Sequence, residues 1–317
     1  MIIILTKKPK ESFFDLSFYK SEIKYFLKKK IQGVRGPGAV IQNLVSGLRK
    51  NNTDFLIDPS IKKIPLGSKL CVIRDVQALN VAIKLKQHDP TKKIFAGPNI
   101  VVTPDENNFI LFSPLIDRII VPSKWVKDFY STFEYQGNKL EDKIKIWPVG
   151  VCVPIDKFIN REICLIYKKN CPEKLFEEIV EFLKKEKIKT EILEYGKFNQ
   201  KTYLELLKKS YFMIYLQEIE SQGLALLESW SYDVPTLVWN NHRYFYPNKK
   251  YSVSGNISAP YLTNQSGLYF EDSIDFKNKL YTFIKDINNF SAKDYVFNNL
   301  SQEKSAENFL KLIKNNG

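Results

Sequence analysis

Short hydrophobic runs alternate with longer segments of helical periodicity along almost the whole chain. This alternation is typical of βαβ units, which build a mostly parallel sheet with helices on both faces. In the first half the predicted strands are residues 2–5, 54–57, 70–73, 93–95, 109–112, 118–121 and 145–147, and the predicted helices are 40–50, 76–87 and 124–133. Ser123 precedes the last of these helices and is a predicted N-cap, because its hydroxyl can accept a hydrogen bond from a first-turn amide.

The second half repeats the alternation. Strands 163–167, 190–193, 212–216 and 236–239 are separated by helices 173–185, 200–210 and 224–232, and a terminal helix spans 301–314. A turn-rich stretch, 148–154, joins the halves. The sequence therefore predicts an α/β protein with two Rossmann-like, doubly wound domains, residues 1–152 and 153–300, followed by a C-terminal helix, 301–317.

Composition narrows the class of protein. The chain has 317 residues and a net charge of +13, which favours anionic partners such as nucleotides, phospholipid surfaces or nucleic acid. The four cysteines form no C-x-x-C pair and there are two histidines, so a disulfide frame, a zinc site or a Ser-His-Asp triad has little material. The first residues are too short for a signal sequence, and no hydrophobic run is long enough to span a bilayer. We expect a cytoplasmic protein.

Residues 220–228, Glu-Ser-Gln-Gly-Leu-Ala-Leu-Leu-Glu, are the strongest local signal of chemistry. They follow a predicted strand and open a helix, whose first amides and positive dipole end favour an anion. Glu228 lies about two turns from Glu220, so the two carboxylates can bind different parts of an extended ligand. The alternative is an ordinary loop and amphipathic helix with a surface glutamate at each end.

Two other segments offer anion-binding groups. Lys169 and Lys174 follow strand 163–167 and enter the next helix, where two ammonium groups can hold a diphosphate, although a solvated lysine face would look the same. Gly36 and Gly38 precede helix 40–50 and let the backbone approach a ligand closely. Their spacing is not G-x-G-x-x-G, so a dinucleotide site is weakly supported.

Together these segments resemble the retaining glycosyltransferases of the GT-B fold, in particular glycosyltransferase family four. Residues 220–228 resemble the E-x7-E motif of that family, and 169–174 resemble its R-x-x-P-E-K segment with Lys in place of Arg. Residues 121–127, 146–151 and 233–238 are similar to its V-P-S-x-x-V, I-x-P-N-G-V and G-x-P-V-V stretches, and 36–38 to its N-terminal glycine loop. The matches keep the family's order over nearly the whole chain.

The resemblance implies the GT-B fold, in which two Rossmann-like domains face a cleft and the C-terminal helix packs back on the N-terminal domain. It implies metal-independent, retaining transfer of a sugar from a UDP- or GDP-sugar to a glycan, lipid-linked or protein acceptor, with no cofactor. Lys169, Lys174 and Glu220 would be catalytic. The remaining implied contacts are to the donor by Ser221, Gly223, Leu224, Glu228, Tyr195, Gly196, Gly36 and Gly38, and to the sugar or acceptor by Asn99.

The chain departs from the family where a histidine often follows a strand of the first domain, because 95–99 reads Phe-Ala-Gly-Pro-Asn. Asn99 can hydrogen-bond but cannot act as a base. A catalytically degenerate binding subunit, a nucleotide-dependent dehydrogenase and a basic nucleic-acid-binding protein therefore stay as alternatives, although we expect no nucleic-acid partner. The absence of a D-x-D pair fits lysine and helix-dipole stabilisation without a metal.

The segment 9–32 is rich in aromatic residues and lysine. Such a segment can dock peripherally on an anionic membrane or a lipid-linked acceptor. The alternative is a helix packed on its domain with a solvated basic face.

Overall fold

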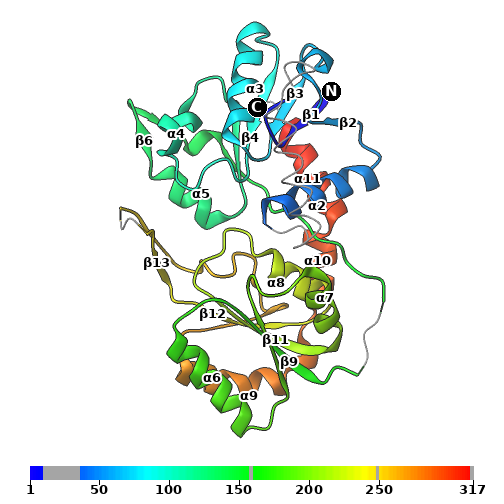
Figure 1. Cartoon of the computed structure of the whole chain (residues 1–317), viewed down its shortest axis with the longest axis vertical. Helices are drawn as coiled ribbons and strands as arrows, with labels where there is room; N and C mark the ends of the chain where they lie inside the picture. Colours follow the sequence, from blue (N-terminus) through cyan, green and yellow to red (C-terminus); the bar gives the residue numbers. More distant parts are fainter. Residues whose placement is uncertain (10–35, 157–159, 248–249, 315–317) are drawn as a thin grey trace. The chain divides into compact units, whose positions relative to one another are not determined.

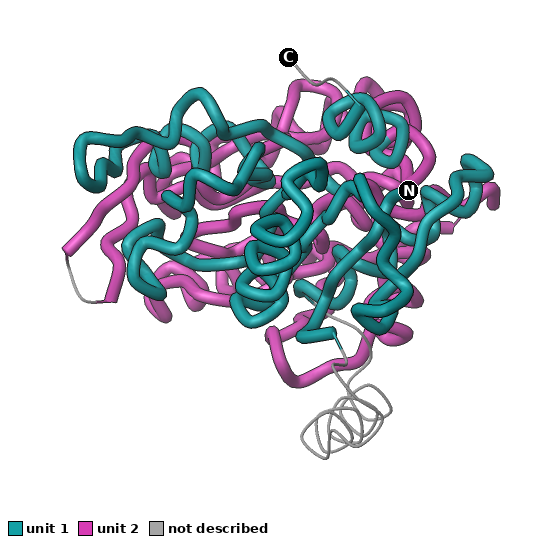
Figure 2. The backbone as a smooth tube through the Cα atoms, turned by 90° about the horizontal axis from the view of Figure 1, so that it is seen from above, with its two compact units in different colours: residues 1–149, 305–317 teal, residues 150–304 magenta. Residues whose placement is uncertain are grey.

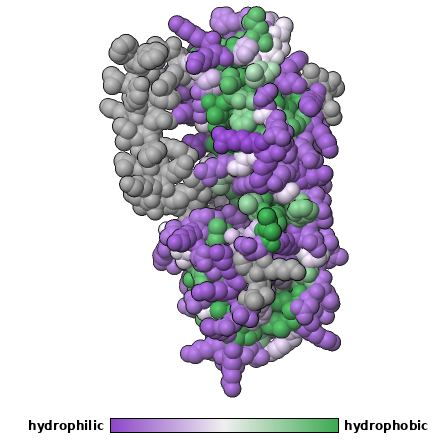
Figure 3. Space-filling model, turned by 90° about the vertical axis from the view of Figure 1, so that its right-hand side faces the viewer, coloured by the Kyte–Doolittle hydropathy of each residue, from purple (hydrophilic) through white to green (hydrophobic). Residues whose placement is uncertain are grey.

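The computed structural model describes residues 1–9, 36–156, 160–247 and 250–314. The chain forms two compact units (Figure 2): unit 1 is residues 1–149 with 305–317, and unit 2 is 150–304. Most of segment 9–32, on which the membrane hypothesis rests, lies outside the described residues. On the face drawn in Figure 3 hydrophilic side chains predominate. No helix among the described residues is long and apolar enough to cross a membrane.

Unit 1 is built on a six-stranded parallel sheet of order β2-β1-β3-β4-β5-β8 (Figure 1). The strands are β1 (Ile2–Leu5), β2 (Phe55–Ile57), β3 (Lys69–Val72), β4 (Lys93–Ala96), β5 (Arg118–Val121) and β8 (Ile144–Ile146). The main helices are α2 (Pro37–Lys50), α3 (Val76–His88) and α5 (Lys124–Ser131), with a small hairpin of β6 (Glu134–Tyr135) and β7 (Asn138–Lys139). Residues Ile3, Ile4 and Leu5 are fully buried, as expected for a central parallel strand.

The C-terminal helix α11 (Gln302–Lys314) completes unit 1. The Trp147 indole N–H donates to the Ser305 carbonyl at 2.9 Å, and the Trp147 ring centroid lies 4.9 Å from that of Phe309. The Lys69 ammonium donates to the Ile313 carbonyl at 2.9 Å. The prediction that this helix packs back on the N-terminal half is confirmed.

Unit 2 is built on a five-stranded parallel sheet of order β10-β9-β11-β12-β15. The strands are β9 (Ile163–Asn170), β10 (Thr190–Glu194), β11 (Ser210–Gln217), β12 (Thr236–Trp239) and β15 (Gly267–Phe270). The helices are α6 (Glu173–Lys185), α7 (Gln200–Lys209), α8 (Leu224–Ser231), α9 (Ser273–Lys285) and α10 (Ala292–Leu300). Two Rossmann-like α/β units are therefore confirmed.

Strand alternation divides the core of unit 2 into two layers. In β9, Leu165 and Tyr167 pack with α7, α8 and α10, whereas Cys164 and Ile166 pack with α6 and α9. Successive side chains of a strand point to opposite faces of the sheet, so each run of β9 supplies both layers. The same alternation directs the polar residues at the end of the strand, which matters for the site below.

The predicted strand over 109–112 is wrong. The chain there makes a short helical turn, α4 (Glu106–Phe109), followed by a 3-10 turn over 110–112. The apolar residues of this segment pack locally: the Phe109 ring stacks on Tyr135 at 4.2 Å and meets Phe112 edge-on at 5.7 Å. Because aromatic packing satisfies the hydrophobic run, its composition does not require a place in the sheet.

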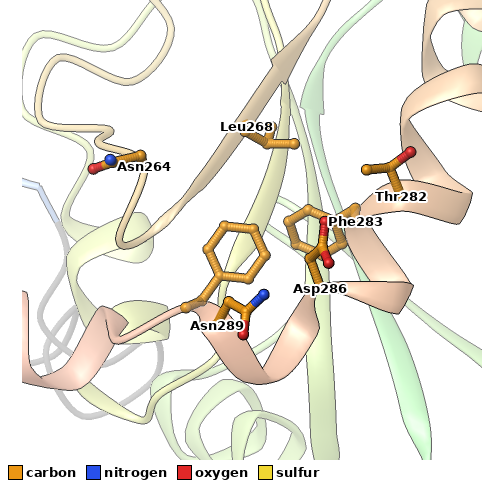
Figure 4. A pocket seen from close by; sticks show the side chains of 7 residues that line it. Asn264, Leu268, Thr282, Phe283, Asp286 and Asn289 are labelled. Atoms are coloured by element: carbon orange, nitrogen blue, oxygen red, sulfur yellow. The ribbon is translucent and has the colours of Figure 1, made fainter.

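The sequence analysis assigned no elements between residues 240 and 300. The structure has β15, α9 and α10 there, and an antiparallel hairpin of β13 (Arg243–Phe245) and β14 (Ser252–Ser254). A pocket of about 230 Å³ also lies in this region. Its lining comes from the end of α9 and its surroundings (Figure 4): Asn264, Leu268, Thr282, Phe283, Asp286, Asn289 and Phe290. Asn264 precedes β15, so the pocket lies toward the amino end of that strand and away from the polar edge described next.

Candidate active site

Polar residues gather at the carboxyl edge of the unit 2 sheet. Because all five strands are parallel, the residues that end or follow them meet at this edge, which is where open α/β sheets bind ligands. β9 ends in Lys168, Lys169 and Asn170, and β11 continues into the loop that begins α8. The Asn170 side-chain amide donates to Glu218 at 3.1 Å, which ties these two strand ends together.

The loop before α8 has the backbone shape of an anion cradle. Gly223, at the N-cap position, has φ of 68°, and a Cβ added there would lie 3.2 Å from the Leu226 Cδ1 atom, so glycine is favoured. Ser221 and Leu224 flank this turn at the start of the helix, where the first amides have no intrahelical acceptor. Gln222 is 6% exposed, and its Nε2 has no hydrogen-bond partner among the described residues. The loop therefore keeps donors unused.

Glu220 is held by a cation and a hydroxyl. The Lys169 Nζ atom lies 2.5 Å from Glu220 Oε1, and the Tyr215 hydroxyl donates to the same oxygen at 2.8 Å. Lys169 also lies 4.9 Å from the centre of the Tyr195 ring. Both charged side chains are largely buried, with 24% of Lys169 and 15% of Glu220 exposed. The structure thus brings together Lys169, Glu220 and Tyr195, which the sequence analysis selected separately.

Strand alternation explains why Lys169 and not its neighbour pairs with Glu220. Lys168 lies on the opposite face of β9, where its ammonium is 2.6 Å from Glu173 and 4.0 Å from the centre of the Phe176 ring. The Glu173 interaction raises the pKa of Lys168. Two adjacent lysines therefore have separate partners on separate faces of one strand.

Glu228, inside α8, has a different environment. Its Oε1 accepts a hydrogen bond from the Gln200 side-chain amide at 2.7 Å. Desolvation by burial raises the pKa of Glu228 to about 7, and the Gln200 hydrogen bond opposes that rise. Tyr203 and Tyr232 are also close enough to interact with it electrostatically.

The other predicted site residues are dispersed. Lys174, in the first turn of α6, is 88% exposed and its partner among the described residues is Glu178 at 3.8 Å. Gly196 follows β10 in a turn with φ of 90°. In unit 1, exposed Asn99 follows the carboxyl end of β4. Gly36 is the N-cap residue of α2 and Gly38 is buried in that helix's first turn.

Sequence reasoning missed the second layer of the site. Tyr215 and Tyr167 stack at 5.1 Å, and Tyr203 lies 5.6 Å from Tyr167 and donates its hydroxyl to the Ala225 carbonyl at 2.6 Å. Gln200 belongs to the same layer through Glu228. The tyrosines read as ordinary core residues, and the available signal was their position on the face of β9 and β11 that leads to the glutamate loop.

No protein-family model and no curated protein sequence matches the chain. Solved structures match over long stretches. The apo form of the lipopolysaccharide outer core galactosyltransferase WaaB aligns with 99% of this chain and 99% of its own at 11% identity and a TM-score of 0.52. The GtfA/B complex aligns with 80% of this chain and 58% of its own at 14% identity and a TM-score of 0.54.

The chain has the GT-B fold of glycosyltransferases. The N-terminal domain of Candida albicans trehalose-6-phosphate phosphatase also aligns, over 100% of this chain and 97% of its own, at 10% identity and a TM-score of 0.54. Identities this low establish a fold and not a reaction, since one fold hosts several functions.

Proposed function

We propose that the protein is a glycosyltransferase that transfers a sugar from a nucleoside diphosphate-sugar, with UDP- or GDP-sugars as the donors to test first, to a glycan, lipid-linked or protein acceptor. The observation that carries the proposal is the Lys169–Glu220 pair beside the start of α8, at the ligand-binding edge of a GT-B unit. We further propose residues 1–152 as the acceptor-side domain and 153–300 as the donor domain, in a protein that works in the cytoplasm.

The diphosphate of the donor requires positive charge that persists as the leaving group departs. Lys169 supplies an ammonium, and the first amides of α8 supply preorganised donors and the positive end of a helix dipole. A diphosphate that pairs with Lys169 competes with Glu220, so donor binding frees the carboxylate to contact the transferred sugar. Lys174 has a long exposed side chain, and we assign it to the distal phosphate.

The remaining donor contacts follow the order of the loop. Ser221, Gly223 and Leu224 present backbone amides to phosphate and sugar, and Glu228 accepts hydrogen bonds from the ribose hydroxyls. Tyr195 and Gly196, at the end of β10, lie on the same edge and are assigned to the base. In unit 1, Gly36 and Gly38 are the proposed donor contacts and Asn99 the proposed sugar or acceptor contact.

The resemblance to retaining enzymes supports transfer with retention and without a metal. In such a step the bond from the anomeric carbon to the diphosphate oxygen breaks, and the acceptor oxygen bonds to the same face of that carbon. The acceptor proton passes to the departing phosphate oxygen. Among the described residues no group of three His, Cys, Asp or Glu side chains could hold a metal ion.

A thermal-shift panel with UDP, GDP, ADP, NAD and short single-stranded DNA, each with and without EDTA, tests the proposal. We expect one nucleoside diphosphate to raise the melting temperature and EDTA to leave that shift unchanged, because a ligand that binds the folded state stabilises it. Sugar transfer is then measured by release of that diphosphate, and we expect Glu220→Ala and Lys174→Ala to abolish it. Stabilisation by DNA alone, lost in moderate salt, would contradict the proposal.

A binding subunit without turnover is the second candidate. It is favoured by Asn99, which stands where the resembling family often has a histidine. Such a protein would show the same diphosphate shift as the transferase but would release no diphosphate from any sugar donor with any acceptor.

A further inference from the structure

The hairpin of β13 and β14 is a rigidly anchored projection beside the glutamate loop. It follows β12 directly and stands out from the body of unit 2 (Figure 1). At its base, fully buried Asn240 donates to Asn256 at 3.0 Å and accepts from Ser258 at 3.3 Å, and the Gly255 amide donates to the His242 carbonyl at 2.8 Å.

The chain that leaves the hairpin is bonded to the candidate site. The Glu220 amide donates to the carbonyl of Ile257, which is itself fully buried, at 2.8 Å. Asn241, which enters the hairpin, donates its side-chain amide to the Glu218 carboxylate at 3.5 Å. The base of the hairpin therefore lies at the edge of the loop that carries Glu220.

One face of the hairpin is exposed and has a distinctive chemistry. The register pairs Arg243 with Ser254 and Phe245 with Ser252, so these four side chains share a face, and all four are exposed. Phe245 is 51% exposed, and the Arg243 guanidinium lies 4.5 Å from the centre of its ring. The opposite face carries Tyr244 and buried Val253 and packs on the protein. We call Arg243, Phe245, Ser252 and Ser254 the hairpin face.

The charge of this region has one sign. No aspartate or glutamate occurs between residues 234 and 270, although the chain has 35 acidic residues in all. Among the described residues no carboxylate forms a salt bridge with Arg243. The guanidinium is therefore available for the bidentate pairing that it makes with carboxylate and phosphate groups.

We propose that the hairpin face binds the acceptor, and that the acceptor is a glycan whose sugar ring carries a carboxylate or phosphate group. The Phe245 ring offers an aromatic face to the C–H side of a pyranose, Arg243 pairs with the adjacent anion, and the two serine hydroxyls bond to sugar hydroxyls. Two hydroxyls beside a single ring suit a glycan better than a lipid surface, which needs a larger apolar area. The proposal rests on the proposed transferase function, because it assigns the acceptor of that site.

The experiment measures binding of the full-length protein to immobilised oligogalacturonate, which has rings and charge, maltoheptaose, which has rings alone, and polyphosphate, which has charge alone. We expect oligogalacturonate to bind about tenfold or more tightly than either. Phe245→Ser and Arg243→Ser should each weaken oligogalacturonate binding about tenfold, and Arg243→Lys should have an intermediate effect because it keeps the charge and loses the planar fork.

A matched control lies on α9, where Tyr281 is 55% exposed and Lys277 lies 5.5 Å from the Phe182 ring centre. Tyr281→Ser and Lys277→Ser remove an exposed aromatic residue and a cation from the same unit, and we expect unchanged binding. Equal binding of the three probes, or hairpin variants that bind like the parent, would overturn the proposal. So would loss of binding to phosphatidylglycerol vesicles but not to glycan in the hairpin variants.

The nucleoside diphosphate shift is measured in parallel for every variant. If it is present and oligogalacturonate binding fails, the acceptor proposal fails and the transferase proposal stands. If it is absent in the parent protein, the transferase proposal itself fails.

Discussion

The two glutamates of the α8 loop are held in opposite ways. Glu220 shares one oxygen between a lysine ammonium and a tyrosine hydroxyl, whereas the Glu228 carboxylate accepts from one neutral amide in a desolvated position. A charged partner stabilises the ionised carboxylate but must be shared with an incoming anion. A neutral partner leaves the carboxylate's charge costly, so its protonation state depends on pH near neutrality.

This difference assigns the two residues to different parts of a reaction. Glu220 changes partner when a diphosphate takes Lys169, so its role is coupled to the donor. Glu228 keeps its partner and tests whether a diol or other donor of hydrogen bonds is present. Four substitutions separate these roles.

The largest effect is expected from Lys169→Ala. Loss of the ammonium removes charge stabilisation of the leaving diphosphate, and we expect the transfer rate to fall by about 10²- to 10³-fold. Lys168→Ala is the matched control, because that lysine lies on the other face of β9 and pairs with Glu173. Rates are measured as diphosphate release; equal losses in both variants would mean that total charge, and not the Glu220 pair, matters.

The second prediction concerns pH and Glu228. Because its pKa is raised to about 7, the affinity for the nucleoside diphosphate should rise as pH increases from 6 to 8 and the carboxylate ionises. Glu228→Gln should lose about tenfold in affinity at pH 8 and lose that part of the pH dependence. Isothermal titration across this range checks the prediction, and the glutamine variant's profile reports the titration of the ligand itself.

The same shift predicts a stability effect of known sign. The folded protein keeps a proton on Glu228 up to a higher pH than the unfolded chain does, so this residue's contribution to the free energy of unfolding falls as pH rises from about 4.5 to 7. Glu228→Gln should therefore be more stable than the parent at pH 8, by roughly 1–3 kcal/mol, in urea unfolding.

The third prediction uses two buried tyrosines of one aromatic layer. Tyr215→Phe removes the hydroxyl that bonds to Glu220, and we expect kcat to fall about tenfold with little change in diphosphate affinity. Tyr203→Phe removes a hydroxyl that bonds to the Ala225 carbonyl and not to Glu220. Both should cost about 1–2 kcal/mol of stability, so a kcat loss confined to Tyr215→Phe reports positioning of Glu220.

The smallest effect is expected from Gln200→Leu. The Gln200 hydrogen bond lowers the pKa of Glu228, so its loss should move the midpoint of the affinity profile to higher pH by several tenths of a unit. At pH 8 the affinity should change only a few-fold. A midpoint that stays in place would show that the carboxylate is held by other groups.

Most of the fold was predictable because strand and helix periods survive in sequence. The strands that end in Lys169 and in the Glu220 loop are fully buried and read as hydrophobic runs. Residues 109–112 read the same way but are satisfied by aromatic packing with Tyr135, which no local pattern encodes. The hairpin was missed because its strands are short and mixed in polarity, so neither period is long enough to detect.

The site was predictable in its charges and not in its pairing. Lysines and glutamates could be selected from their places after strands, but which lysine meets which glutamate depends on strand parity and on the tight loop at Gly223. Tyr215 and Gln200 carry no charge and occupy ordinary core and helix-start positions. Their roles depend on contacts between elements distant in sequence, and one chain alone does not reveal those.

The crossing of the chain at Gly150 has a consequence for synthesis. A Cβ at this residue would lie 2.2 Å from the Ser301 carbonyl oxygen, so the outgoing and returning segments pass each other closely. The Trp147 indole and its partner Phe309 belong to one unit but are separated by the whole of the other. On the ribosome the first unit waits, its tryptophan uncovered, until the second has been made, so it is the last to close although it is the first to emerge.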